Sequence, residues 1–400
     1  MKYISASEAA RRWGVAPRAV QRYCASGKIE GAKKYGRAWM LPEDAERPPD
    51  NRKKAEEPPP QPYPGLFLME NLCLDGRSPE EIAAELPDDE SRREFFWEFA
   101  LIQGKTKASM DICGQMPRNT RFRITVLHGR NIAAIRGGRY HALCRSMHAL
   151  NSLRKEQCAS PLALSCIDLA EAVVYASVYA PDHCPRWLQE GDFSHLPEDA
   201  KPFALYLYTL YLNGTEQLQR MLGVTEAALA HPSRRGFTVS ELYLRIMRVN
   251  ALVALDRREQ ARELLAHALE TAIPYGLLSP FSEQLATMRG LLEEVARRRF
   301  PEAYKQIRKG WKEVFTGWTE IRNRILDTEN TKLLTAREYQ IALLLVDGKS
   351  CKEIAQSMNT TPAGINYSLQ IMREKLGVKK SRDIVPFVTW SKEQPHNLRK

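Results

Sequence analysis

Near the amino terminus, cationic and amide side chains follow a predicted helix start. A helix is expected to begin at Pro17, because proline already has the helical φ angle. Arg18, Gln21 and Arg22 lie in its first two turns, and side chains three and four residues apart share one helix face. Arginine and glutamine donate hydrogen bonds to phosphates and to base edges. This face therefore predicts contact with a nucleic acid.

The carboxyl-terminal stretch "SCKEIAQSMNTTPAGINYSLQIMREKLGVKK" has a similar arrangement. Thr361-Pro362 predicts a second helix start, and Asn359 can take the left-handed backbone conformation of a turn before it. Both stretches have a small residue, then a turn residue four positions on and an apolar residue six further on. These are Ala10, Gly14 and Val20 in the first stretch, and Ala355, Asn359 and Ile365 in the second. That spacing is typical of a helix-turn-helix, in which two helices cross closely.

Capping boxes mark predicted helix starts ahead of both turns. In a capping box, a hydroxyl and a carboxylate three residues later each accept a hydrogen bond from the other's backbone amide. The pairs are Ser5 with Glu8, Thr335 with Glu338, and Ser350 with Glu353. We therefore expect ordered helices on the amino-terminal side of each turn.

After the first helix-turn-helix, "KIEGAKKYGRAWML" predicts two short extended runs about a glycine-containing turn. This hairpin would present Lys33, Lys34 and Arg37. Residues 3–47 resemble the winged helix-turn-helix of the MerR and excisionase-like families, including the "GKI-GA" step and the aromatic-proline close of the wing. The resemblance implies that this module binds double-stranded DNA.

The carboxyl-terminal stretch is similar to the LuxR-type helix-turn-helix over about 55 residues, through "LTxRE", "GKSxKEIA" and "REKLGV" followed by "KSR". The resemblance implies a four-helix fold that binds DNA. It carries the DNA-facing positions over to Lys352, Thr361, Ala363, Asn366 and Tyr367.

This stretch also departs from the LuxR pattern. Gly364, Ile365 and Asn366 stand where the family usually has Thr-Val-Lys, and Ser368 stands in place of a histidine. Asn366 removes one cationic contact. A group of nearby cations could offset this loss by contacting the DNA backbone, namely Lys375, Lys379, Lys380 and Arg382.

The excess positive charge is concentrated at the two ends of the chain. Residues 1–41 hold 9 Lys/Arg against 2 Asp/Glu, and residues 333–400 hold 11 against 6. The whole chain has a net charge of +11, so the long middle is close to neutral. A surface charge that served only solubility would be spread out, whereas polyanion binding concentrates it. No long apolar run or signal core occurs, and the 8 cysteines form no CxxC pair, so we expect a cytoplasmic chain without membrane contact.

The predicted fold class is mainly α, with three structural parts. Apolar residues recur at helical spacing from Leu66 to about Arg324, and "ELYLRIMRVNALVALDRREQARELLAHALETAIPYG" resembles a tetratricopeptide-like hairpin of two helices joined by a four-residue turn. An apolar stripe at 307–325 predicts a helix that packs on this superhelix or joins two subunits. The expected organisation is a winged helix-turn-helix with a small β-hairpin at 1–47, a Pro-rich linker at 48–64, a helical-repeat domain at 65–300, a connecting helix at 301–330, a LuxR-type module at 331–388 and a tail at 389–400.

Other chemistry finds little support in the sequence. "GKT" at 104–106 lacks the earlier glycine of a phosphate loop, and His141, Cys144 and His148 lack a fourth metal ligand. We therefore expect no enzyme activity, no cofactor and no bound metal. The sequence predicts a DNA-binding transcription regulator whose middle domain senses an effector or forms a homodimer. The alternative is an interaction scaffold whose terminal modules dock on protein.

Overall fold

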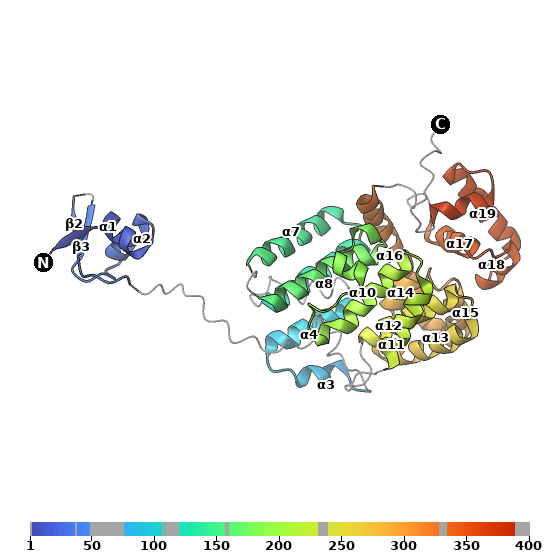
Figure 1. Ribbon diagram of the computed structural model, residues 1–400. Helices are drawn as coiled ribbons and strands as arrows, with labels where there is room; N and C mark the ends of the chain where they lie inside the picture. Colours follow the sequence, from blue (N-terminus) through green and yellow to red (C-terminus); the bar gives the residue numbers. More distant parts are fainter. Residues whose placement is uncertain are drawn as a thin grey trace. The chain divides into compact units, whose positions relative to one another are not determined.

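The computed structural model describes residues 2–36, 38–48, 76–105, 108, 120–156, 160–230, 239–327 and 334–388. The chain divides into two compact units, Met1–Pro62 and Tyr63–Lys400, both drawn in Figure 1. The fold is mainly helical, as predicted from the sequence. Of the helices in the described ranges, none is both long enough and apolar enough to cross a membrane.

The first unit pairs two helices with a small sheet. Its elements are β1 (Tyr3–Ser5), α1 (Ala6–Trp13), α2 (Pro17–Ala25), β2 (Lys33–Tyr35) and β3 (Ala38–Pro42). Ser5 Oγ accepts a hydrogen bond from the Glu8 amide at 3.2 Å, and α1 ends at Gly14, whose φ of 63° is left-handed. Ala10 and Val20 are buried, which brings α1 and α2 together as the spacing predicts.

The sheet has three strands rather than the predicted two. β3 is central and pairs antiparallel with β2 on one side and with β1 on the other. β1 was missing from the prediction because three residues are too few to show alternation, and its last residue, Ser5, also caps α1. Of the capping box predicted at Ser5 and Glu8, the structure shows only the bond that the serine accepts.

The second unit begins with a helical domain. Its α-helices are α3 (Pro79–Ala84), α4 (Asp89–Ile102), α6 (Thr120–Arg136), α7 (Tyr140–Glu156), α8 (Pro161–Ser177), α9 (Arg186–Glu190), α10 (Lys201–Gly214), α11 (Leu218–Ala230), α12 (Val239–Ala254), α13 (Arg258–Ala272), α14 (Ser279–Gln284), α15 (Leu291–Arg299) and α16 (Pro301–Leu326). Short 3₁₀ helices occupy Pro181–His183, Glu198–Ala200 and Ile273–Tyr275. Consecutive helices pack on one another, as α6 does on α7 and α12 on α13.

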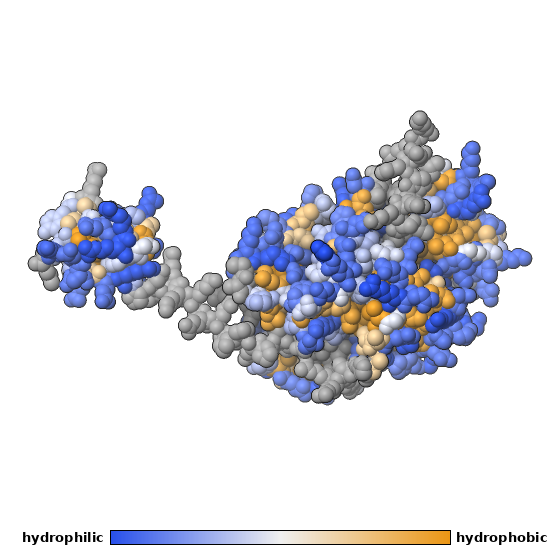
Figure 2. Space-filling view, viewed as in Figure 1, coloured by the Kyte–Doolittle hydropathy of each residue, from blue (hydrophilic) through white to orange (hydrophobic). Residues whose placement is uncertain are grey.

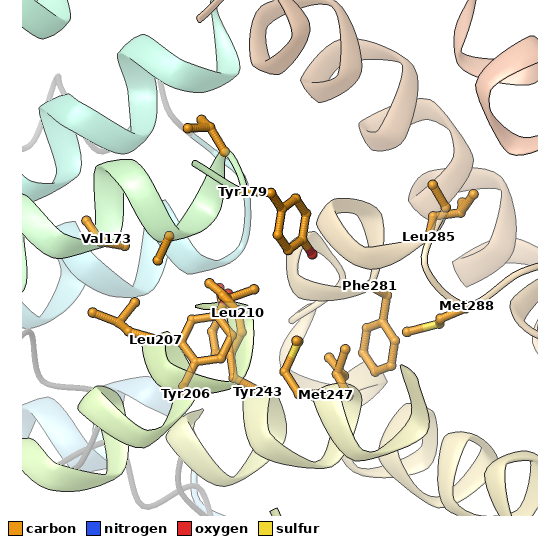
Figure 3. Close-up of a cluster of buried hydrophobic side chains, with 14 of the residues drawn as sticks. Val173, Tyr179, Tyr206, Leu207, Leu210, Tyr243, Met247, Phe281, Leu285 and Met288 are labelled. Atoms are coloured by element: carbon orange, nitrogen blue, oxygen red, sulfur yellow. The ribbon is translucent and has the colours of Figure 1, made fainter. Parts of the chain in front are cut away.

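The hairpin of α12 and α13 matches the predicted pair of helices, with a connection of residues 255–257 that is one shorter than expected. Ala251, Ala261 and Ala268 are buried where the two helices approach. Aromatic side chains fill much of the surrounding core, part of which is drawn in Figure 3. Tyr206 and Tyr243 have ring centroids 4.5 Å apart in this cluster.

α16 is buried along its apolar stripe within the second unit. Ile307, Trp311 and Ile321 are buried, and the helix packs against α6, α14 and α15. Trp318 Nε1 donates a hydrogen bond to the Ser177 carbonyl at 2.9 Å. The stripe therefore packs on the helical domain, which is the first of the two roles predicted for it.

The carboxyl-terminal module consists of α17 (Ala336–Val346), α18 (Cys351–Ser357), α19 (Pro362–Leu376) and η5 (Ser381–Phe387). Both predicted capping boxes, at Thr335 with Glu338 and at Ser350 with Glu353, are present. The fourth element is a 3₁₀ helix rather than an α-helix. It contains Pro386, which has no backbone N–H for an α-helical hydrogen bond.

Candidate nucleic-acid interfaces

α2 presents the three predicted contact residues of the first unit on its exposed face. Arg18, Gln21 and Arg22 are exposed, whereas Val20 and Tyr23 on the other side of α2 are buried. Pro17 occupies the start of α2, no side chain caps that end, and its first turn holds no acidic residue. The free N–H groups and the positive end of the helix dipole both favour a phosphate at this end.

The β2–β3 hairpin carries more cations. Lys33 and Lys34 are exposed, and Lys33 Nζ lies 5.8 Å from the centroid of the Tyr3 ring. Tyr35 at the end of β2 is 64% exposed, which is unusual for a large aromatic side chain. Arg37, also predicted to contact DNA, lies outside the described residues. The side of the first unit drawn in Figure 2 is mostly hydrophilic.

The cations of the first unit differ in their ion pairing. Arg12, on α1, lies 3.4 Å from the Glu43 carboxylate. Within the described part of the chain, Arg18, Arg22, Lys33 and Lys34 form no ion pair. Their charge is therefore available to an anionic partner.

In the carboxyl-terminal module, α18 and α19 are joined by a tight turn. Asn359 has a left-handed φ of 47°, and Ala355 and Ile365 are buried at the contact of the two helices. Thr361 Oγ1 accepts a hydrogen bond from the Gly364 amide at 3.1 Å and so caps α19. The helix-turn-helix predicted from this spacing is present.

The exposed face of α19 carries the predicted DNA-facing side chains. Thr361, Ala363, Asn366 and Tyr367 are exposed, as is Lys352 on α18. Tyr367 is 66% exposed. Among the described residues, Tyr35 and Tyr367 are the large hydrophobic side chains that are exposed. Each lies close in sequence to residues of its module that are predicted to contact DNA.

Two departures from the family pattern have local structural roles. A Cβ atom at Gly364 would lie 3.3 Å from Thr361 Oγ1 and 3.4 Å from Thr360 Oγ1, so the missing side chain leaves room for two hydroxyls. Ser368 Oγ donates a hydrogen bond to the Gly364 carbonyl at 3.0 Å. Its hydroxyl hydrogen is thereby directed back onto the helix and away from a base.

Four cations could offset the absence of the family's lysine at position 366, and one of them has a structural role instead. Lys375 Nζ donates hydrogen bonds to both carboxylate oxygens of Glu338, at 2.9 and 2.8 Å. Burial raises the pKa of Glu338, but hydrogen bonds from Lys375 and Thr335 outweigh it and leave the pKa below its usual value. Lys379, Lys380 and Arg382 are exposed, so they stay candidates for backbone contacts.

Replacing Lys375 by methionine is expected to lower the unfolding free energy of the carboxyl-terminal module by about 1–2 kcal/mol at neutral pH, because it leaves the carboxylate of Glu338 without its cation. The pKa of Glu338 is lower in the folded state than in the unfolded chain. Its hydrogen bonds therefore stabilise the module at pH values above the pKa that Glu338 has in the unfolded chain. This contribution is lost as the pH falls through the folded pKa. The difference in unfolding free energy between the Lys375→Met variant and the native chain should therefore become smaller in acid. Urea unfolding at neutral and acidic pH measures it, with Lys379→Met as the control that should leave stability unchanged.

The module packs on the helical domain through α17 and α18. Arg289, which follows α14, pairs with Asp347, and Gln340 Nε2 donates a hydrogen bond to Glu293 Oε1 at 3.2 Å. The Tyr339 ring lies 5.2 Å from that of Phe315. The exposed face of α19 takes part in none of these contacts. Nothing in the spacing of these residues along the chain predicts this packing.

A comparison with protein-family models found a match for part of this chain. Residues 332–388 match the family model of bacterial regulatory proteins of the luxR family, named GerE. No curated protein and no solved structure matches the chain. The carboxyl-terminal module is therefore a LuxR-type helix-turn-helix domain. The MerR-like and tetratricopeptide-like resemblances stay predictions.

Proposed function

We propose that this chain is a transcription regulator that binds DNA through two unlike helix-turn-helix modules. The LuxR-type domain at 332–388 supports DNA binding at the carboxyl-terminal end. The observation that carries the two-module proposal is that both ends expose the second helix of a closely turned helix pair, α2 and α19, and that the predicted contact residues on these two helices form no ion pair with the described residues. In this proposal the Pro-rich segment at 48–64 sets the separation of two half-sites.

The two modules would contact DNA differently. The first has two arginines and a glutamine on α2, and arginine binds guanine or phosphate through two parallel hydrogen bonds. α19 instead presents Asn366, whose amide suits an adenine edge, and Tyr367, whose ring can pack on a thymine methyl group or a sugar. Base selectivity would therefore be strongest in the half-site that α2 contacts, with the cations at 379–382 contributing backbone contacts.

Salt dependence is expected to separate this proposal from the scaffold alternative. If about five of the exposed cations contact phosphates, the log of the association constant should fall with log salt at a slope of roughly −4 to −5. Fluorescence anisotropy with a labelled duplex measures this slope. The double variant Lys33→Ala and Lys34→Ala should make the slope shallower by about 2. A slope near zero, with tight binding to a protein partner instead, would support the scaffold.

A further inference from the structure

A cavity of about 70 Å³ lies in the second unit, where the helical domain meets the carboxyl-terminal module. Its walls come from α6, α8, α10, α14 and α16 of the helical domain and from α17 of the module. Tyr339 is the residue that α17 contributes to this lining. A molecule in the cavity would therefore contact both parts at once.

Aromatic rings form much of the cavity wall. The centroid of the Trp318 ring lies 6.3 Å from that of Tyr179 and 6.0 Å from that of Tyr339. Trp311 also lines the cavity. Figure 3 draws Tyr179 in the upper part of the buried cluster, and its hydroxyl donates a hydrogen bond to Gln284 Oε1 at 3.1 Å. Rings at offset or edge-to-face angles bind a further aromatic ring well.

The charged groups of the cavity wall neutralise one another. The Arg136 guanidinium forms an ion pair with Glu283, and it also donates hydrogen bonds to Ser279 Oγ at 2.9 Å and to the Leu101 carbonyl at 3.0 Å. The pair is largely buried, with side chains 12% and 22% exposed. The two charged lining residues are thus paired with each other, and a charged ligand would lose its hydration, which favours a neutral molecule.

Two polar groups of the lining residues lack a hydrogen-bond partner among the described residues. They are Tyr339 Oη and Trp311 Nε1. Tyr339 is 2% exposed and Trp311 is 7% exposed. An unpaired buried donor costs free energy, and a bound acceptor recovers it after a small side-chain adjustment. The lining therefore favours a ligand that carries an oxygen acceptor on its ring.

We propose that this cavity binds a small neutral molecule with one aromatic ring and one hydroxyl or carbonyl group, and that its binding strengthens the docking of residues 334–388 on the helical domain. A cavity of about 150 Å³ holds one benzene ring, so this smaller cavity admits at most one ring, with the lining side chains moving slightly to make room. A ligand that contacts both parts favours the docked arrangement over an undocked one. The regulatory meaning of this docking rests on the proposed function, but the binding itself does not.

Phenol is the probe for the binding step, measured on the full chain by equilibrium dialysis and by tryptophan fluorescence. We expect saturable binding with one site, and no saturable binding of benzoate, which has a similar ring but a charge. Val314→Phe fills the cavity from α16 and should weaken phenol binding at least tenfold. Val224→Phe on α11, a half-buried valine away from the cavity, is the matched control and should bind as the native chain does. Tyr339→Phe should weaken binding by about five- to tenfold, because it removes one hydroxyl.

Hydrogen exchange measures the docking step. Phenol should slow exchange of the α17 amides in the native chain and leave them unchanged in Val314→Phe. The proposal is overturned if the native chain binds no phenol, if Val314→Phe binds it as well as Val224→Phe, or if bound phenol leaves α17 exchange unaltered. Neither readout uses DNA, so a failure here is distinct from a failure of the proposed function.

Discussion

Replacing Gly317 by alanine is expected to destabilise the second unit by about 3 kcal/mol or more. Gly317 lies within α16, at its crossing with the end of α6. A Cβ atom there would lie 2.0 Å from the Arg136 carbonyl oxygen and 2.6 Å from the Gly138 nitrogen. Both are backbone atoms, so no side-chain rotation relieves the overlap. α16 would have to move away from α6 and take the buried aromatic stripe with it.

Helix propensity predicts the opposite sign for this substitution, because alanine favours an α-helix by about 1 kcal/mol over glycine. Gly223 on α11 provides the matched control, since a Cβ atom there meets nothing within 4 Å. Thermal or urea unfolding of the full chain should show Gly223→Ala as stabilised and Gly317→Ala as strongly destabilised. Equal stability of the two variants would show that α6 and α16 do not cross this closely.

Arg22→Ala is expected to weaken binding to a specific DNA site by about 1–3 kcal/mol, roughly five- to 150-fold in affinity. Arg22 is exposed on α2, forms no ion pair with the described residues, and has the buried Tyr23 beside it to hold the helix in place. Removing its side chain therefore changes the surface and leaves the core unaltered. Anisotropy titrations with the selected site and with an unrelated duplex measure the effect.

Arg22→Lys shows which kind of contact has been lost. Lysine keeps the charge but loses the planar pair of donors that binds a guanine edge. If Arg22 contacts a base, lysine should restore little of the affinity for the selected site, and discrimination between the two duplexes should fall. Full recovery with lysine would place Arg22 on the DNA backbone. Unchanged binding by Arg22→Ala would remove α2 from the interface.

Local features of the sequence predicted much of the fold. The helix starts at Pro17 and Pro362, the left-handed turns at Gly14 and Asn359, and the capping box at Ser350 are all present. Each depends on residues within four positions of one another, where backbone geometry and hydrogen bonds are decided locally. The all-helical middle follows from periodicity in the same way.

Long-range pairings could not be predicted in this manner. Lys375 is one of the cations that could contact the DNA backbone, but it pairs with Glu338, 37 positions earlier. The ion pair of Arg289 with Asp347 spans 58 positions. Nothing in the spacing of such residues marks them as partners, because helix packing decides which charges meet. The same reason hides the cavity at Tyr339 and the docking of the LuxR-type domain.

The docking of the carboxyl-terminal module limits which variants can test DNA binding by both modules. Deleting the carboxyl-terminal module would uncover the aromatic residues of α16, including Phe315, which contact α17. Variants of exposed residues avoid this problem. The first variant replaces Arg18, Gln21 and Arg22 by alanine, and the second replaces Thr361, Asn366 and Tyr367 by alanine.

The most direct measurement is a selection of genomic DNA fragments with three full-length proteins, the native chain and these two variants. If both modules bind DNA, the native chain should enrich a composite site, and each variant should lose the preference for a different half of it. Loss of selection by the first variant alone would mean that the LuxR-type domain contributes no base contacts. Enrichment of no sequence by the native chain would contradict the account and favour the protein-docking scaffold.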